Sequence, residues 1–201
     1  MRINTEQGLR ELYGQPKQKA VQKQLAQLEK HSINFLKLSP FAVISSYDQE
    51  GKVDSSPRGG EPGFARVISN TEIAIADARG NNRLDSLCNI VQSGQIGCLF
   101  MIPGIDETLR INGTAYLSID PQDLQHSSGD KNPPKSVIRI AVTEVFLHCA
   151  KSMMRSKLWH AQSLQQRDVL PSMGTMIAEQ TGGVAPIETQ QQMMERFKDQ
   201  L

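Results

Sequence analysis

The spacing of apolar residues changes twice along the chain, giving a helical start, a strand-rich middle and a helical end. Over the first thirty residues apolar side chains recur at helical spacing, and Pro16 divides this stretch into two segments. The apolar positions are Leu9, Leu12 and Tyr13 in the first segment, then Val21, Leu25 and Leu28 in the second. Residues 17–30 carry only one narrow apolar stripe on a surface rich in Gln and Lys, which predicts a helix on the outside of a core.

A strand pattern begins after Pro40. Short runs rich in β-branched and aromatic residues alternate with turn residues, which predicts antiparallel hairpins. The expected strands are residues 41–47, a return strand from residue 52, then 64–68, 72–76, 96–102, 107–119 and 136–148. The polar segment 122–134 is predicted to be a loop with one helical turn. The middle of the chain therefore holds about seven strands.

One predicted helix interrupts these strands. Asn81 or Asn82 is expected to cap it, Arg83 lies in its first turn, and Ser93-Gly94 ends it. Its apolar positions are Leu84, Leu87, Cys88 and Val91. Consecutive hairpins with a single interposed helix predict a closed or nearly closed antiparallel barrel with helices packed outside, because closure removes exposed sheet edges.

Helical spacing returns after Cys149, in segments that cover residues 153–159, 171–180 and 186–201. A length of 201 residues suits one domain that buries a substantial core. We therefore expect a mainly β protein with a single domain over residues 1–201. Its barrel core should span about residues 35–150, with helical extensions at both ends.

The composition of the chain disfavours several classes of binding partner. The 22 Lys and Arg residues against 21 Asp and Glu residues leave a net charge of +1, so no overall field attracts nucleic acid or an anionic membrane. The three cysteines, Cys88, Cys98 and Cys149, have no CxxC spacing and fit neither a disulfide framework nor a zinc site. No run approaches a membrane span, and residues 1–4 do not begin a signal peptide. We expect a soluble cytoplasmic protein that binds no metal, nucleic acid or membrane.

Two candidate anion sites lie in turns. Residues 55–60 end a strand in a Pro/Gly turn that holds Arg58 outward, and residues 77–83 lead into the predicted helix. A helix start presents free N–H groups and a positive dipole end, both of which suit a phosphate. A surface turn and a simple helix cap would also explain these two patterns.

A third candidate site lies on a strand. Between residues 107 and 113, Thr108, Arg110 and Asn112 face one side, while Leu109 and Ile111 face the other. Asn is unfavourable within a strand, which favours a binding site over the alternative of a solvent-facing sheet surface.

In combination and order, these elements resemble the FMN-binding split-barrel proteins related to pyridoxamine 5′-phosphate oxidase, over about residues 35–160. Arg58 matches a family arginine after a Ser-containing strand end, and Asn81-Asn82-Arg83 with Leu87 matches the helix-opening element. Residues 108–113 match a Gln-x-Arg-x-x-Gly element, in which Thr108 replaces the glutamine. In the helix-opening element, Asn82 replaces an arginine. The family's Arg-Leu-His-like substrate motif is absent from residues 155–159. Ser-Pro-Arg-Gly, Gly-Asn-Asn-Arg and His-Cys-Ala-Lys elements make the chain most similar to a branch of FMN-dependent enzymes of unassigned substrate.

The resemblance implies an oxidoreductase that works as a homodimer, with FMN bound in clefts between the subunits. The implied cofactor-binding residues are Arg58, Gly59, Ala76, Asp77, Asn81, Asn82, Arg83, Thr108 and Arg110. Arg83, Asn82 and either Arg58 or Arg110 would hold the phosphate, and the ring would lie near Gly59 and Ala76-Asp77. His148, Lys151 and Arg155 would bind an anionic substrate or the nicotinamide donor NAD(P)H. Efficient oxidation of pyridoxamine 5′-phosphate is not expected.

Other functions remain open from the sequence. A flavin carrier or sensor without catalysis would keep the phosphate-binding arginines, and a related split barrel can use a deazaflavin or haem. A Cys-His hydrolase built on His148 and Cys149 is disfavoured, because adjacent residues on a strand point to opposite faces.

Overall fold

The computed structural model describes residues 2–77, 80–125, 132–183 and 188–198. Within these ranges, seven strands form one sheet in the order β2-β1-β5-β6-β7-β4-β3, and every neighbouring pair is antiparallel. The strands are β1 (Phe41–Tyr47), β2 (Val53–Gly59), β3 (Ala65–Ser69), β4 (Glu72–Ala76), β5 (Gln95–Met101), β6 (Thr108–Ser118) and β7 (Val137–His148).

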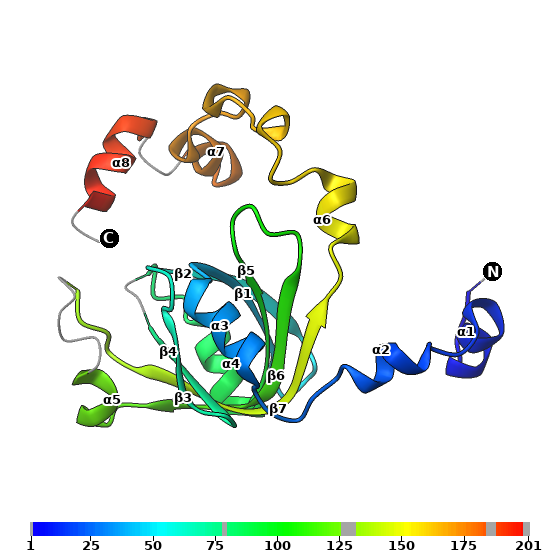
Figure 1. Cartoon of the computed structure of the whole chain (residues 1–201). Helices are drawn as coiled ribbons and strands as arrows, with labels where there is room; N and C mark the ends of the chain where they lie inside the picture. Colours follow the sequence, from blue (N-terminus) through cyan, green and yellow to red (C-terminus); the bar gives the residue numbers. More distant parts are fainter. Residues whose placement is uncertain (1, 78–79, 126–131, 184–187, 199–201) are drawn as a thin grey trace.

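The topology explains why the barrel is split. The hairpins β1–β2 and β3–β4 sit at opposite ends of the strand order, and the meander β5–β6–β7 joins them. β2 and β3 are thus the two edges of a strongly curled sheet (Figure 1). This arrangement confirms the predicted antiparallel split barrel, its seven strands and its flanking helices.

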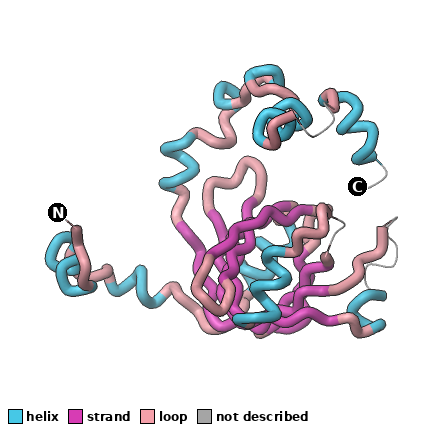
Figure 2. Tube along the Cα trace, turned by 180° about the vertical axis from the view of Figure 1, so that it is seen from behind, coloured by secondary structure: helices cyan, strands magenta, loops and turns pink. Residues whose placement is uncertain are grey.

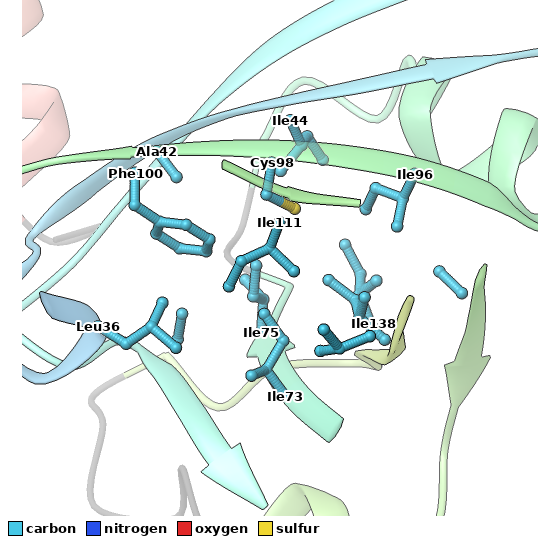
Figure 3. Close-up of a cluster of buried hydrophobic side chains, with 14 of the residues drawn as sticks. Leu36, Ala42, Ile44, Ile73, Ile75, Ile96, Cys98, Phe100, Ile111 and Ile138 are labelled. Atoms are coloured by element: carbon cyan, nitrogen blue, oxygen red, sulfur yellow. The ribbon is translucent and has the colours of Figure 1, made fainter. Parts of the chain in front are cut away.

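Alternating side chains of the strands fill the interior. Ile44, Phe100, Ile111 and Ile138 are fully buried and meet inside the curled sheet, together with Leu36 from a helix (Figure 3). Burying such side chains contributes roughly 1.5–3 kcal/mol each. The alternation predicted for residues 107–113 is confirmed, because Leu109 and Ile111 are both buried.

The predicted helix over residues 17–30 is wrong. The helix predicted before Pro16 forms as α1 (Glu6–Tyr13), but residues 17–30 form only the short α2 (Gln18–Gln22) and an irregular stretch that leads to α3 (Lys30–Leu38). Leu25 in that stretch exchanges two backbone hydrogen bonds with Val145 of β7, at 2.9 and 2.8 Å. Glu29 then caps α3 in a capping box with Ser32. Leu28 is buried as expected, but it lies outside any helix.

The start of α4 (Asp85–Ser93) also differs from the prediction. Neither asparagine caps it: the N-cap is Leu84, in the left-handed region at φ 60°, and Asn82 shares that φ. Asn81 Oδ1 accepts from the Arg83 N–H at 3.0 Å, so Arg83 lies in the loop before the helix. Gly94 ends α4 as predicted, at φ 65°.

The buried face of α4 lies one position away from the predicted stripe. Leu87 and Ile90 are buried, as are the polar Ser86 and Asn89. Cys88 and Val91, both expected inside, are exposed. Asn89 stays satisfied by donating to Ser46 Oγ at 3.1 Å, which lets a polar residue occupy the face against β1.

Both ends of the chain extend away from the barrel. In the two opposite views, α1 and α2 project to one side, whereas the C-terminal helices arch over the top (Figures 1 and 2). The remaining helices are α5 (Pro121–Gln125), α6 (Lys151–Ser156), η1 (Ala161–Ser163), η2 (Arg167–Val169), α7 (Met173–Gln180) and α8 (Gln190–Lys198). The expected final helix had included residues 186–187 and 199–201, which lie outside the described residues. Among the described helices, none is long and apolar enough to cross a membrane.

Candidate functional site

A cleft of about 1360 Å³ opens beside the edge strand β2. Its walls come from β2, the end of β4, the loop before α4, α4 itself and the segment before β7. It gathers seven predicted cofactor residues, namely Arg58, Gly59, Ala76, Asp77, Asn81, Asn82 and Arg83. Two candidate anion sites separated in sequence thus share one cleft.

Arg58 places a positive charge on the edge strand beside the cleft. It lies in β2, where Asp54, Ser56 and Arg58 are the partly buried positions of an alternating strand. Its Nη1 donates to Ser56 Oγ at 2.6 Å and to the Pro57 carbonyl oxygen at 2.8 Å. Among the described residues it forms no ion pair. The guanidinium therefore retains donors for a bound molecule.

The loop before α4 provides a second set of donors. Arg83 is exposed, and its Nε donates to Asp85 Oδ2 at 2.8 Å, which holds the side chain beside the helix start. No N-cap side chain accepts from the first turn of α4, and Ser86 Oγ is occupied with Asp54 Oδ2 at 2.7 Å. The first backbone N–H groups of a helix have no partner within it. They are therefore available to an anion in the cleft.

Asp77 is a partly buried acid of the cleft. Burial raises the pKa of its carboxyl group, and the positive charges of Arg58 and Lys135 partly offset that rise. The Asp77 backbone N–H donates to the Ser136 carbonyl oxygen at 2.9 Å, which continues the β4–β7 ladder by one residue.

Lys135 is a cleft residue that the sequence reasoning missed. It lies just before β7, between the predicted loop over residues 122–134 and the predicted strand over residues 136–148, where no site was predicted. Its place beside Asp77 follows from the pairing of Ala76 with Val137, a long-range register that no local pattern shows. Lys135 also forms no ion pair within the described part of the chain.

The structure does not bring Thr108 and Arg110 into this cleft. As predicted, Leu109 and Ile111 face the core, so Arg110 faces the outer side of β6. There it pairs with Glu144 and lies 5.0 Å from the centre of the Phe146 ring. Its buried Nε has no hydrogen-bond partner. Within one chain, Arg110 cannot share a phosphate with Arg83.

The predicted substrate residues also lie outside the cleft. The His148 ring packs edge-on at 4.9 Å against Phe146, and burial, with help from the charges of Arg110 and Lys23, lowers the His148 pKa. Lys151 and Arg155 are exposed on α6. None of these three residues is among those that line the cleft.

The residues of the cleft fit a flavin mononucleotide. Its phosphate needs several donors, which Arg83 and the uncapped start of α4 offer, and Arg58 and Lys135 add two further cations to the cleft. Its ring needs apolar surface, which is supplied by Ile75, Leu87 and Leu117. No group of three His, Cys, Asp or Glu side chains in the described ranges is arranged to hold a metal ion.

Comparison with known proteins agrees with the observed fold. A family model described as pyridoxamine 5′-phosphate oxidase matches residues 28–149. HupZ of group A Streptococcus is 17% identical, with 60% of this chain and 93% of that chain covered at a TM-score of 0.50. A candidate pyridoxamine 5′-phosphate oxidase from Lactobacillus delbrueckii is 16% identical (61% and 95% covered, TM-score 0.48). An FMN-binding protein from Syntrophomonas wolfei is 12% identical (58% and 81% covered, TM-score 0.43). A search of curated proteins finds no match.

Proposed function

The chain belongs to the pyridoxamine 5′-phosphate oxidase family of flavin-binding proteins, and on that premise we propose that it is an FMN-dependent oxidoreductase. The observation that carries the proposal is the meeting of Arg58 with Asn81, Asn82 and Arg83 in one cleft. The loop of Asn81, Asn82 and Arg83 suits the phosphate of a mononucleotide, and Arg58, from a separate element, adds a cation for the rest of the flavin.

The phosphate would bind at the loop before α4. Arg83 and Asn82 would meet it together with the N–H groups of the first helical turn, and Arg58 adds a further positive charge to the cleft. Hydrogen bonds to charged groups contribute roughly 1.5–3 kcal/mol each. The bond from Arg83 to Asp85 presets the position of the arginine beside this loop.

The flavin supplies the hydride and electron transfer when bound, and the protein supplies orientation and electrostatics. Gly59, Ala76 and Asp77 lie where the ring would rest. Ligand pockets commonly measure about 300–1,000 Å³. A cleft of about 1360 Å³ therefore has room for a second small molecule beside the cofactor.

The substrate is proposed to be a small electron acceptor, with NAD(P)H as the electron donor. Residues 155–159 lack the Arg-Leu-His-like motif of the pyridoxal-type enzymes, so pyridoxamine 5′-phosphate should be oxidised poorly. A flavin carrier is the alternative. Turnover with NAD(P)H and a panel of acceptors distinguishes the two, because a carrier would bind FMN without steady-state turnover.

The working unit is proposed to be a homodimer with residues of both chains around each flavin. The extensions support this, because no residue of α1, α2, α6 or α8 is buried. Leu12 and Tyr13 of α1 are 64% and 75% exposed. A helix of eight residues is marginal in water on its own, so α1 needs a surface on which to bury this apolar face.

The phosphate site is tested by the Arg83→Ala substitution. Loss of one or two charge-assisted hydrogen bonds should raise the Kd for FMN about 10- to 100-fold, measured by quenching of flavin fluorescence. Lys19→Ala on the distant α2 is the matched control and should leave the Kd unchanged. Unaltered FMN affinity in a folded Arg83→Ala protein would refute this assignment.

A further inference from the structure

Three charged side chains of the cleft come from three different elements. Arg58 belongs to β2, Asp77 follows β4, and Lys135 precedes β7. The hydrogen bond from the Asp77 N–H to the Ser136 carbonyl oxygen, 2.9 Å long, holds the last two segments side by side. The pairing of β4 with β7 therefore places a lysine next to an acid that is 58 positions earlier in the chain.

The two cations act on the same carboxylate. Both Arg58 and Lys135 lower the Asp77 pKa against the larger opposing effect of burial. Neither forms an ion pair among the described residues, and Arg58 donates only to Ser56 and Pro57 there. Of the three acids that line the cleft, Asp85 pairs with Arg83 and Asp54 accepts from Ser86 Oγ, whereas Asp77 is the carboxylate beside these two cations.

This set of groups matches one part of a flavin. The pyrimidine edge of the ring presents a carbonyl oxygen, an N–H group and a second carbonyl oxygen in sequence. An ionised aspartate only accepts hydrogen bonds, whereas arginine and lysine only donate them. We propose that Arg58, Asp77 and Lys135 recognise the pyrimidine edge of the flavin, with Asp77 accepting from the ring N–H and the two cations donating to the carbonyl oxygens.

A phosphate fits this set less well. Its oxygens are acceptors, so the Asp77 carboxylate would repel it at short range. At the start of α4 both nearby acids are already engaged, because Asp85 pairs with Arg83 and Asp54 accepts from Ser86 Oγ. The inference rests on the proposed flavin function, and it assigns the ring to the end of the cleft near Asp77.

The test uses three ligands: FMN, riboflavin and 3-methylriboflavin, in which a methyl group replaces the ring N–H. Each is titrated into wild type, Asp77→Ala, Asp77→Asn and Lys135→Gln, with Asp168→Asn and Lys19→Gln as surface controls and circular dichroism as the check on folding. Asp77→Ala and Lys135→Gln should each weaken FMN and riboflavin by a similar factor of about ten. Asp77→Asn keeps an acceptor oxygen and should recover part of this loss.

The methylated ligand isolates the role of Asp77. Wild type should bind 3-methylriboflavin at least about tenfold more weakly than riboflavin, and Asp77→Ala should cause no further loss. The proposal is overturned if the variants weaken FMN but spare riboflavin, since the groups then serve the phosphate. Equal binding of riboflavin and 3-methylriboflavin, or unchanged affinities in both variants, also overturns it while leaving the flavin function intact. Failure of wild type to bind FMN and riboflavin contradicts the proposed function itself.

Discussion

Asp77 illustrates how a residue suited to binding can weaken the fold that carries it. Burial raises its pKa in the folded chain above the unfolded value, so the folded state holds this proton more tightly. The free energy of unfolding therefore falls as the pH rises from the unfolded pKa through the folded pKa. At pH values above both the unfolded and the folded pKa, the ionised carboxylate lowers the free energy of unfolding by its full amount. At pH values below both, this destabilisation vanishes.

This pH dependence of the free energy of unfolding yields a prediction for the flavin-free protein. Asp77→Asn should raise the Tm at pH 7.5, because the amide removes the cost of a partly buried charge. The difference in Tm between variant and wild type should shrink as the pH is lowered towards 4. Thermal unfolding followed by circular dichroism at several pH values measures it. A variant no more stable than wild type at pH 7.5, or a gain that grows at low pH, would contradict this account of Asp77.

Gly113 sets the register between the two longest strands. The β6–β7 ladder shifts between Asn112 and Gly113, and a Cβ atom at position 113 would lie 2.1 Å from the Ala141 carbonyl oxygen. A real Cβ never approaches so closely, so an added methyl group must push the strands apart. Only glycine lets the two backbones meet at this bulge.

Replacing Gly113 with alanine should therefore be costly. We expect Gly113→Ala to lower the free energy of unfolding by about 3 kcal/mol, and the Tm by roughly 6–12 °C. Gly80→Ala is the control, because nothing lies within 4 Å of a Cβ built there and its φ is not positive. Similar Tm values for the two variants in thermal unfolding would show that the backbones separate easily at this point.

Secondary structure could be predicted where the pattern is local. The strand over residues 72–76 was expected with the same bounds that β4 shows, because its alternation and flanking turns are complete within a few residues. The prediction of a helix over residues 17–30 failed because Leu25 pairs with Val145, which is 120 positions away in the chain. Local spacing of apolar residues cannot show such a contact. The prediction of where α4 starts failed because Leu84 adopts a left-handed backbone conformation, which apolar residues rarely do.

The same limit applies to the cleft. Arg58 and the turn at Asn81–Arg83 stood out in the sequence, because glycine, proline and asparagine mark sharp backbone turns around them. Arg110 looked equally suitable, and only the sheet shows that it faces Glu144 on the outer side. Lys135 looked like an ordinary loop lysine, because its position beside Asp77 depends on the register of β4 with β7.

The whole molecule carries almost no net charge, so binding has to arise from local arrangement. With +1 overall, long-range attraction of an anionic ligand is weak, and the acids Asp54, Asp77 and Asp85 balance the cations of the cleft. The exposed apolar faces of the terminal extensions are the basis of the proposed homodimer. A homodimer would cover these faces and bring the outer residues of one chain towards the cleft of the other.

The most direct test of the account is the flavin content of the assembled protein. Full-length chain is saturated with FMN, passed through size exclusion, and measured by light scattering together with absorbance at flavin and protein wavelengths. The account predicts a particle of twice the 22.3 kDa chain mass that retains one FMN per chain. A particle that elutes free of FMN would contradict the cleft assignment, and a monomer that retains its full share of FMN would contradict the shared dimer site.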